Sequence, residues 1–135
     1  MLLLDSEAIS CIAHGPPRRR DRVRALVMEM RARDLPVATV AAVLAEVVRG
    51  RPADVGIFAG LRRERVEVHP VDTRAGVRAG QLLGQVGAGS ELAVDAFLVA
   101  DADLRGGAVI ATVDTGDLRR LASVAARVHV ADLGA

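Results

Sequence analysis

The chain has 135 residues, of which 51% are hydrophobic, and its mean hydropathy is +0.29. This length and composition allow one sizeable core, so we expect a single domain spanning residues 1–135. The formal net charge of +1 gives no overall signature of nucleic-acid binding, and all 18 basic residues are Arg. Sites that require a Lys, including the P-loop, are therefore excluded.

Apolar runs alternate along the chain with segments of helical periodicity, which predicts an α/β fold in which helices connect the strands of a central parallel sheet. We expect strands at residues 2–5, 36–39, 66–69, 108–111 and 127–130. We expect helices at residues 6–13, 19–33, 40–49, 53–63, 73–86, 91–104 and 115–124. Ser90 is the expected N-cap of the sixth helix.

The sequence shows neither a targeting segment nor a pair of cysteines that could form a disulfide. No segment has the apolar length of a membrane span, and Asp5 follows Met1 too closely for a signal peptide. The single cysteine, Cys11, cannot form an internal disulfide. We therefore expect a cytoplasmic protein that does not associate with membranes.

Three acids interrupt or end apolar segments. Asp5 closes the first apolar run, where it could N-cap the following helix, a role compatible with metal binding. Glu46 and Asp95 interrupt apolar helices, in which an ionised carboxylate is costly unless it is paired or ligated. A functional role therefore explains Glu46 and Asp95 better than a solvated helix face.

A further acidic pair, Asp114 and Asp117, follows the strand expected at 108–111. Asp is common in turns, but the carboxyl ends of parallel strands form ligand sites, and Asp5 ends another such strand. We therefore expect these acids to converge and to hold a divalent metal ion. Asp101 and Asp103 are not spaced three or four residues from Asp95, so both are expected to face solvent.

Arginine is the only available contact for phosphates. Arg18, Arg19 and Arg20 concentrate positive charge beside a proline turn and could bind phosphate, although a solvated face or an acidic partner explains them equally well. Phe58 and Phe97 are the only aromatic residues, which excludes base stacking as the principal mode of RNA recognition. The three His residues are expected to serve structure.

The ordered motifs Leu4-Asp5-Ser6, Ala45-Glu46-Val47-Val48-Arg49-Gly50, Val94-Asp95-Ala96 and Thr112-x-Asp114-x-x-Asp117-Leu118 resemble those of the PIN domain, in particular VapC-like toxins. Each motif is short, but their order and spacing cover nearly the whole chain. The resemblance implies a parallel sheet flanked by helices on both faces. It also implies Mg²⁺- or Mn²⁺-dependent cleavage of single-stranded RNA, a small antitoxin partner and a homodimer.

Carried over residue by residue, the family's acids match Asp5, Glu46 and Asp95, with either Asp114 or Asp117 as the fourth. Ser6 and Thr112 match small hydroxyl positions that support the acidic site or contact water or phosphate. Glu7 departs from the family pattern and adds negative charge. It motivates one alternative, a catalytically weak module that binds RNA or protein. The scarcity of aromatic residues motivates another, a small-molecule phosphohydrolase.

Overall fold

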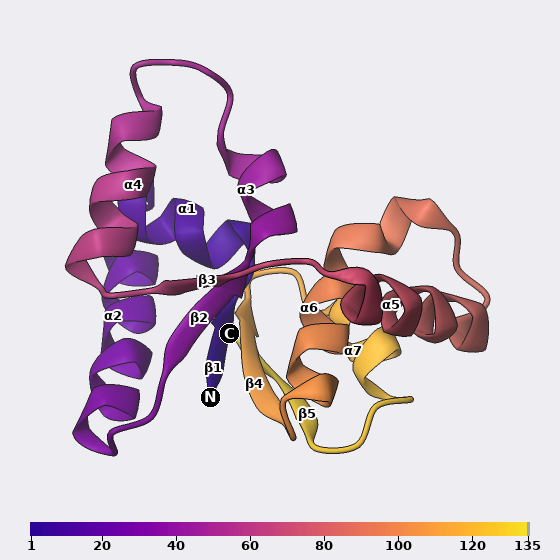
Figure 1. The fold of residues 1–135 in the computed structure, drawn as a ribbon. Helices are drawn as coiled ribbons and strands as arrows, with labels where there is room; N and C mark the ends of the chain where they lie inside the picture. Colours follow the sequence, from indigo (N-terminus) through magenta and orange to yellow (C-terminus); the bar gives the residue numbers. More distant parts are fainter. Residues whose placement is uncertain (135) are drawn as a thin grey trace.

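The computed structural model describes residues 1–134 and contains one five-stranded sheet flanked by seven α-helices (Figure 1). The strands are β1 (Leu2–Leu4), β2 (Val37–Val40), β3 (Glu67–His69), β4 (Ala108–Thr112) and β5 (Val128–Asp132). The helices are α1 (Ser6–His14), α2 (Pro17–Ala32), α3 (Ala41–Val47), α4 (Asp54–Arg63), α5 (Thr73–Val86), α6 (Ala93–Leu104) and α7 (Gly116–Ala122). The predicted α/β class is confirmed.

The sheet is parallel throughout, with strand order β3-β2-β1-β4-β5. The chain first builds outward from β1 to β3, and then returns to place β4 on the other side of β1. Leu3 of β1 is consequently paired with Ala38 of β2 and with Ile110 of β4. The order of the strands reverses between β1 and β4, and the carboxyl ends of strands at such a point are where open α/β sheets bind ligands.

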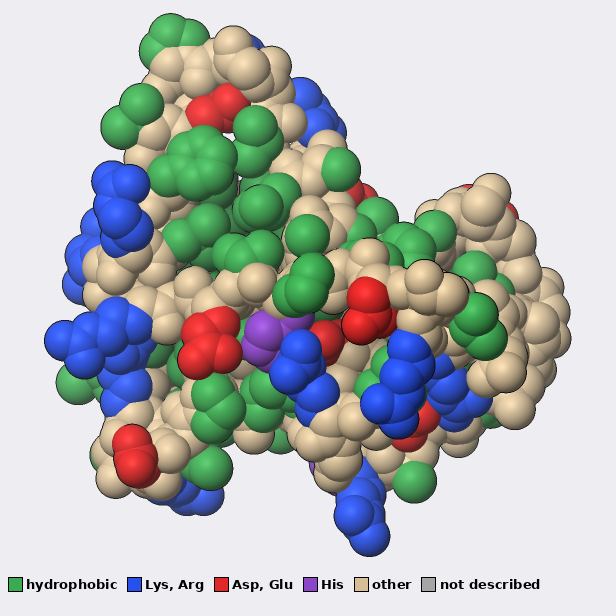
Figure 2. Space-filling view, viewed as in Figure 1, with side chains coloured by type: hydrophobic (Ala, Val, Ile, Leu, Met, Phe, Trp, Pro, Cys, Tyr) green, Lys and Arg blue, Asp and Glu red, His purple; other side chains and the backbone are tan. Residues whose placement is uncertain are grey.

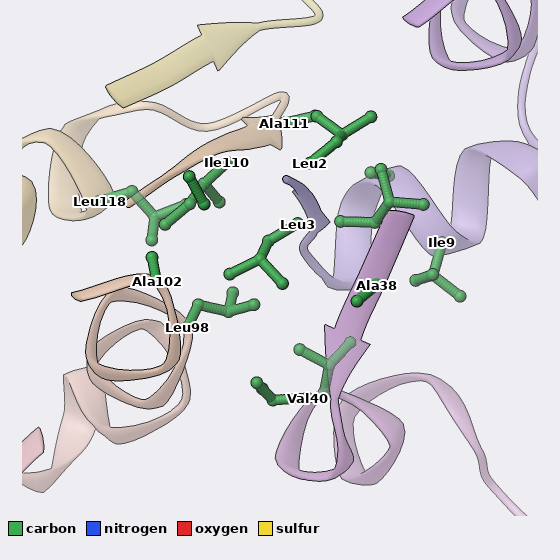
Figure 3. Packing of buried hydrophobic residues seen from close by; sticks show 14 of the residues in the cluster. Leu2, Leu3, Ile9, Ala38, Val40, Leu98, Ala102, Ile110, Ala111 and Leu118 are labelled. Carbon is green, nitrogen blue, oxygen red and sulfur yellow. The ribbon is translucent and has the colours of Figure 1, made fainter. Parts of the chain in front are cut away.

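Helices cover both faces of the sheet, as predicted. In Figure 1, α1, α2 and α4 lie on one side, and α5, α6 and α7 lie on the other. The three residues of β1 are almost completely buried and belong to a core that also contains Ile110 of β4 and Leu98 of α6 (Figure 3). Because both faces are covered, the central strands read as continuous apolar runs rather than as alternating patterns.

The glycines of two helices have different surroundings. On α4, which packs on α1, a Cβ atom at Gly56 would lie 2.6 Å from Cε1 of His14, so the exposed His14 imidazole would have to move. On α5, Gly76, Gly80 and Gly84 face open space, with no atom within 4 Å of a Cβ built at any of them. The fold does not require glycine at these three positions.

The structure corrects two details of the expected elements. Ser90 does not cap α6, because it begins a short 3₁₀ helix, Ser90–Leu92, that leads into α6. The predicted helix at 40–49 is shorter, since α3 ends at Val47 and Val48 is extended. Among residues 1–134, no helix is both long and apolar enough to cross a membrane.

The expectation that Asp101 and Asp103 face solvent is wrong. Asp101 is 5% exposed, its Oδ2 lies 2.8 Å from Nδ1 of His69, and its Oδ1 accepts a hydrogen bond of 3.0 Å from Nε of Arg105. Asp103 is partly buried and pairs with Arg78 at 2.7 Å. The expectation failed because residues of other elements, His69 of β3 and Arg78 of α5, pack against these two acids.

Candidate active site

Every candidate acid predicted from the sequence lines one hollow of about 150 Å³. Its lining residues are Asp5, Ser6, Glu7, Glu46, Asp95, Thr112, Asp114 and Asp117. The acids lie at or just beyond the ends of β1 and β4, on α3, which follows β2, and at the starts of α6 and α7. The topology therefore brings together carboxylates that are far apart in the sequence.

Asp5 is the most buried of these acids, at 5% exposure. Its Oδ1 accepts a 2.8 Å hydrogen bond from the Ala8 N–H, so the predicted N-cap of α1 is confirmed. Its own N–H donates to the Ala111 carbonyl at 3.3 Å, which fixes Asp5 beside the end of β4. Burial raises the pKa of Asp5 to about 6, although the Ala8 N–H and the neighbouring Thr112 hydroxyl oppose the rise.

Thr112 closes the turn that carries Asp114. Its buried hydroxyl donates to the Asp114 carbonyl at 3.0 Å and accepts from the Asp114 N–H at 3.1 Å. The Asp114 side chain also accepts a long hydrogen bond of 3.4 Å from the Gly116 N–H. Asp114 and Asp117 are both exposed, so their carboxylates lie at the solvent side of the hollow.

Asp95 occupies the first turn of α6 and is partly buried. Burial raises the pKa of Asp95 to about 6, and the negative charges of Glu46, Asp117 and Asp114 add to the rise. The argument that its carboxylate is partly desolvated therefore holds. Each of these three carboxylates is therefore close enough to Asp95 to repel its charge.

The same burial argument is wrong for Glu46, which is exposed. It belongs to the last turn of α3, and Val43 is the only buried residue of that helix. The apolar residues around Glu46 in the sequence belong to a short helix at the rim of the hollow, so they do not surround its carboxylate. Glu46 still lines the hollow and raises the pKa of Asp95.

Carboxylate oxygens are the ligands that Mg²⁺ and Mn²⁺ prefer, so the donor set fits a hard divalent cation. Repulsion among ionised carboxylates would also be relieved by such a cation. Within the part of the chain that the structure describes, however, no three Asp, Glu, His or Cys side chains are grouped closely enough to hold an ion as they stand. The acids surround the hollow without closing on one point.

The remaining predicted contacts lie outside the hollow. Arg18, Arg19 and Arg20 are in the first turns of α2 and do not line it, so their contact with phosphate stays a prediction. Sequence reasoning missed Thr39, a fully buried residue of β2 whose hydroxyl donates to the Leu4 carbonyl at 2.7 Å. This bond holds the backbone immediately before Asp5, and the signal was a hydroxyl within an otherwise apolar strand.

A larger hollow, of about 390 Å³, lies at the amino ends of β2 and β3. Arg31, Asp34, Arg65 and Glu67 bring charges of both signs to it, so it does not concentrate acids. Converging carboxylates therefore distinguish the smaller hollow.

No protein-family model matches the sequence, and no curated protein matches it. A solved structure does match in its fold. The chain is similar to a chain in the crystal structure of VapBC2 from Rickettsia felis bound to a DNA fragment from their promoter. The two chains are 16% identical, the match covers 97% of each, and the TM-score is 0.68. At this level of identity the similarity establishes the fold. The chain therefore has the PIN-like fold that its motifs predict.

Proposed function

We propose that the chain is a Mg²⁺- or Mn²⁺-dependent endoribonuclease and the toxin of a toxin–antitoxin pair. The observation that carries this proposal is the convergence of six carboxylates, including that of Glu7, on one hollow at the carboxyl ends of the strands. The similarity in fold to a chain of VapBC2 supports it. A structural role explains the cluster poorly, because mutual repulsion and burial both disfavour the ionised state of Asp95.

In this proposal Asp5 and Asp95 hold the cation from the inner side of the hollow, and Glu46 with Asp114 or Asp117 completes the ligand set. The bound cation would lower the pKa of a water molecule and neutralise charge on the phosphate. Thr112 and the Ala8 N–H restrict the orientations of Asp114 and Asp5.

Glu46 and Asp117 are exposed and line the hollow, and in this proposal whichever of the two does not hold the cation orients the attacking water and accepts its proton. The water oxygen forms a bond to phosphorus while the bond from phosphorus to the 3′ oxygen breaks, and the departing 3′ oxygen takes up a proton from solvent. The products are a 5′-phosphate and a 3′-hydroxyl. Arg side chains supply the contacts to the RNA backbone, since the chain contains no Lys.

An antitoxin partner needs a surface that it can cover, and α4 offers exposed apolar side chains. Val55 is 69% exposed and Phe58 is 42% exposed. Figure 2 shows hydrophobic side chains gathered over the region of α3 and α4. An apolar patch of this kind supports association with another chain. The homodimer implied by the family resemblance stays a prediction.

The test is cleavage of a mixed, structured RNA pool by the purified chain with Mg²⁺, with Mn²⁺ and with chelator. We expect discrete cuts that require metal and are lost in Asp95→Asn. Asp21→Asn, which changes an exposed acid on α2, should cleave like the wild type. Folded, inhibitor-free protein that cuts no RNA would overturn the nuclease proposal. RNA binding would then support a binding module, and phosphate release from nucleotides would support a phosphohydrolase.

A further inference from the structure

The connection between α3 and α4 is held by a single carboxylate. Asp54, the first residue of α4, accepts hydrogen bonds from the N–H groups of Arg49 at 3.1 Å, Gly50 at 2.7 Å and Arg51 at 3.1 Å. Gly50 has a φ of +71°, and this left-handed conformation suits glycine. Three successive N–H groups thus surround one carboxylate, which is the arrangement of a backbone anion nest.

The electrostatics of Asp54 agree with this geometry. Desolvation opposes its ionisation, but the three backbone hydrogen bonds outweigh that effect and lower the pKa of Asp54. The carboxylate is therefore ionised at neutral pH and keeps the connection folded against the start of α4.

Arg49 joins this connection to the end of α3. Its Nη1 donates to the Ala45 carbonyl at 2.6 Å and to the Val48 carbonyl at 2.9 Å. Ala45 precedes Glu46 directly, so the guanidinium caps the turn that carries the proposed ligand. This cap matters because α3 has seven residues and no side-chain N-cap, and isolated helices of that length are unstable.

The other end of the connection leads into α4, which packs on α1. Gly56 of α4 lies beside His14 of α1, and α1 begins immediately after Asp5. Asp54 therefore belongs to a helix that is packed on α1, and from there its carboxylate holds the residues that follow α3. The contacts form a continuous path from Asp5 through α1, α4 and Asp54 to Arg49 and Glu46.

We propose that Asp54 and Arg49 are positioning residues that set Glu46 relative to Asp5 and Asp95. The inference rests on the proposed function in one respect, namely that the hollow binds a divalent cation. Neither Asp54 nor Arg49 lines the hollow, so both act through Glu46. Arg49 is exposed, and its Nη1 is engaged by the two carbonyls of Ala45 and Val48.

Mn²⁺ affinity, measured by titration calorimetry of the full chain, tests this coupling in a double-mutant cycle. Asp54→Ala should weaken Mn²⁺ binding about tenfold, as outer-shell changes commonly do. Adding Asp54→Ala to Glu46→Gln should cause little further loss, because both changes remove the same ligand. Independent, multiplicative losses would overturn the proposal.

Two further variants separate positioning from general destabilisation. Asp72→Ala removes a comparable cap, the carboxylate that accepts the Ala75 N–H at 2.9 Å at the start of α5, and should leave Mn²⁺ affinity unchanged. Arg49→Met keeps the Arg49 N–H but removes the guanidinium, and it should reproduce the non-additivity with Glu46→Gln even if Asp54→Ala does not fold.

Amide hydrogen exchange, measured without metal, tests the positioning role independently of cation binding. The Val48 N–H donates to the Leu44 carbonyl at 2.9 Å, and its exchange should accelerate about tenfold in Arg49→Met, in keeping with a lost cap. Exchange in α6 should not change. Unchanged Val48 exchange overturns the positioning role. If the wild type binds no Mn²⁺ while Val48 responds as expected, the proposed metal site fails and the anchor of α3 stands.

Discussion

Replacing Asp95 by Asn should stabilise the metal-free protein at neutral pH. The carboxylate is partly buried, and Glu46, Asp117 and Asp114 add negative charge around it. These effects raise its pKa from 3.8 to about 6, so the native state binds the proton more tightly than the unfolded chain does. Stability from this group is therefore present below pH 3.8 and is lost as the pH rises to about 6.

The size of the effect follows from the shift. A rise of about two pK units corresponds to roughly 3 kcal/mol at about 1.4 kcal/mol per unit. Because Asp95 is partly open to solvent, screening reduces this figure, and we expect a gain of about 1.5 kcal/mol for Asp95→Asn at pH 7.5. In a chain of 135 residues this gain raises Tm by about 5 °C.

Thermal unfolding at pH 7.5 and pH 4, with chelator, measures this gain. The stabilisation should be present at pH 7.5 and largely absent at pH 4, where the wild-type carboxyl is protonated in the native state. Asp21→Asn, an exposed acid on α2, is the control and should change Tm little at either pH. A lower Tm for Asp95→Asn at pH 7.5 would falsify the view that Asp95 is electrostatically strained. With saturating Mn²⁺ the order should reverse, since the wild type alone gains full binding energy.

Three further substitutions test the packing in urea denaturation. Gly80→Ala should stabilise the protein by about 0.5–1 kcal/mol, because its Cβ meets open space and alanine favours helix; no gain would mean that α5 is not a regular solvent-facing helix. Gly56→Ala should change stability little, because the exposed His14 imidazole can rotate away from the new Cβ and alanine favours helix; a loss of several kcal/mol would mean that His14 is fixed against α4. Thr112→Val should cost about 1 kcal/mol because the part-buried N–H and carbonyl of Asp114 lose their hydroxyl partner, and an unchanged midpoint would argue against the hydroxyl closing its turn.

Much of the fold was readable from the sequence because local patterns and topology agree. All five strands and seven helices lie within a few residues of their expected positions. The strands β1, β2 and β4 are almost entirely buried, so their apolar runs stand out, and the breaks at Gly15 and Gly50 follow the ends of α1 and α3. The convergence of the acids followed from the parallel sheet, because the carboxyl ends of its strands share one edge.

What failed depended on contacts between distant elements. The apolar residues around Glu46 in the sequence predicted that its side chain is buried. The helix α3 is short, however, and leaves that side chain exposed at the rim of the hollow. Asp101 was expected in solvent, but its partner His69 lies on β3, and no spacing within α6 reveals that pairing. The three N–H groups that hold Asp54 depend on a left-handed Gly50, and single-sequence patterns do not specify where the resulting loop points.

The strand order also governs what an incomplete chain can do during translation. A ribosome releases β1 first, yet one of its two pairing partners, β4, begins only at Ala108. Until then the apolar backbone of Leu2–Leu4 has an open edge, and the turn bearing Asp114 does not exist. Nascent chains therefore carry an unpaired, aggregation-prone edge and an incomplete set of acids. The set of acids that lines the hollow is complete only after Asp117 has been made.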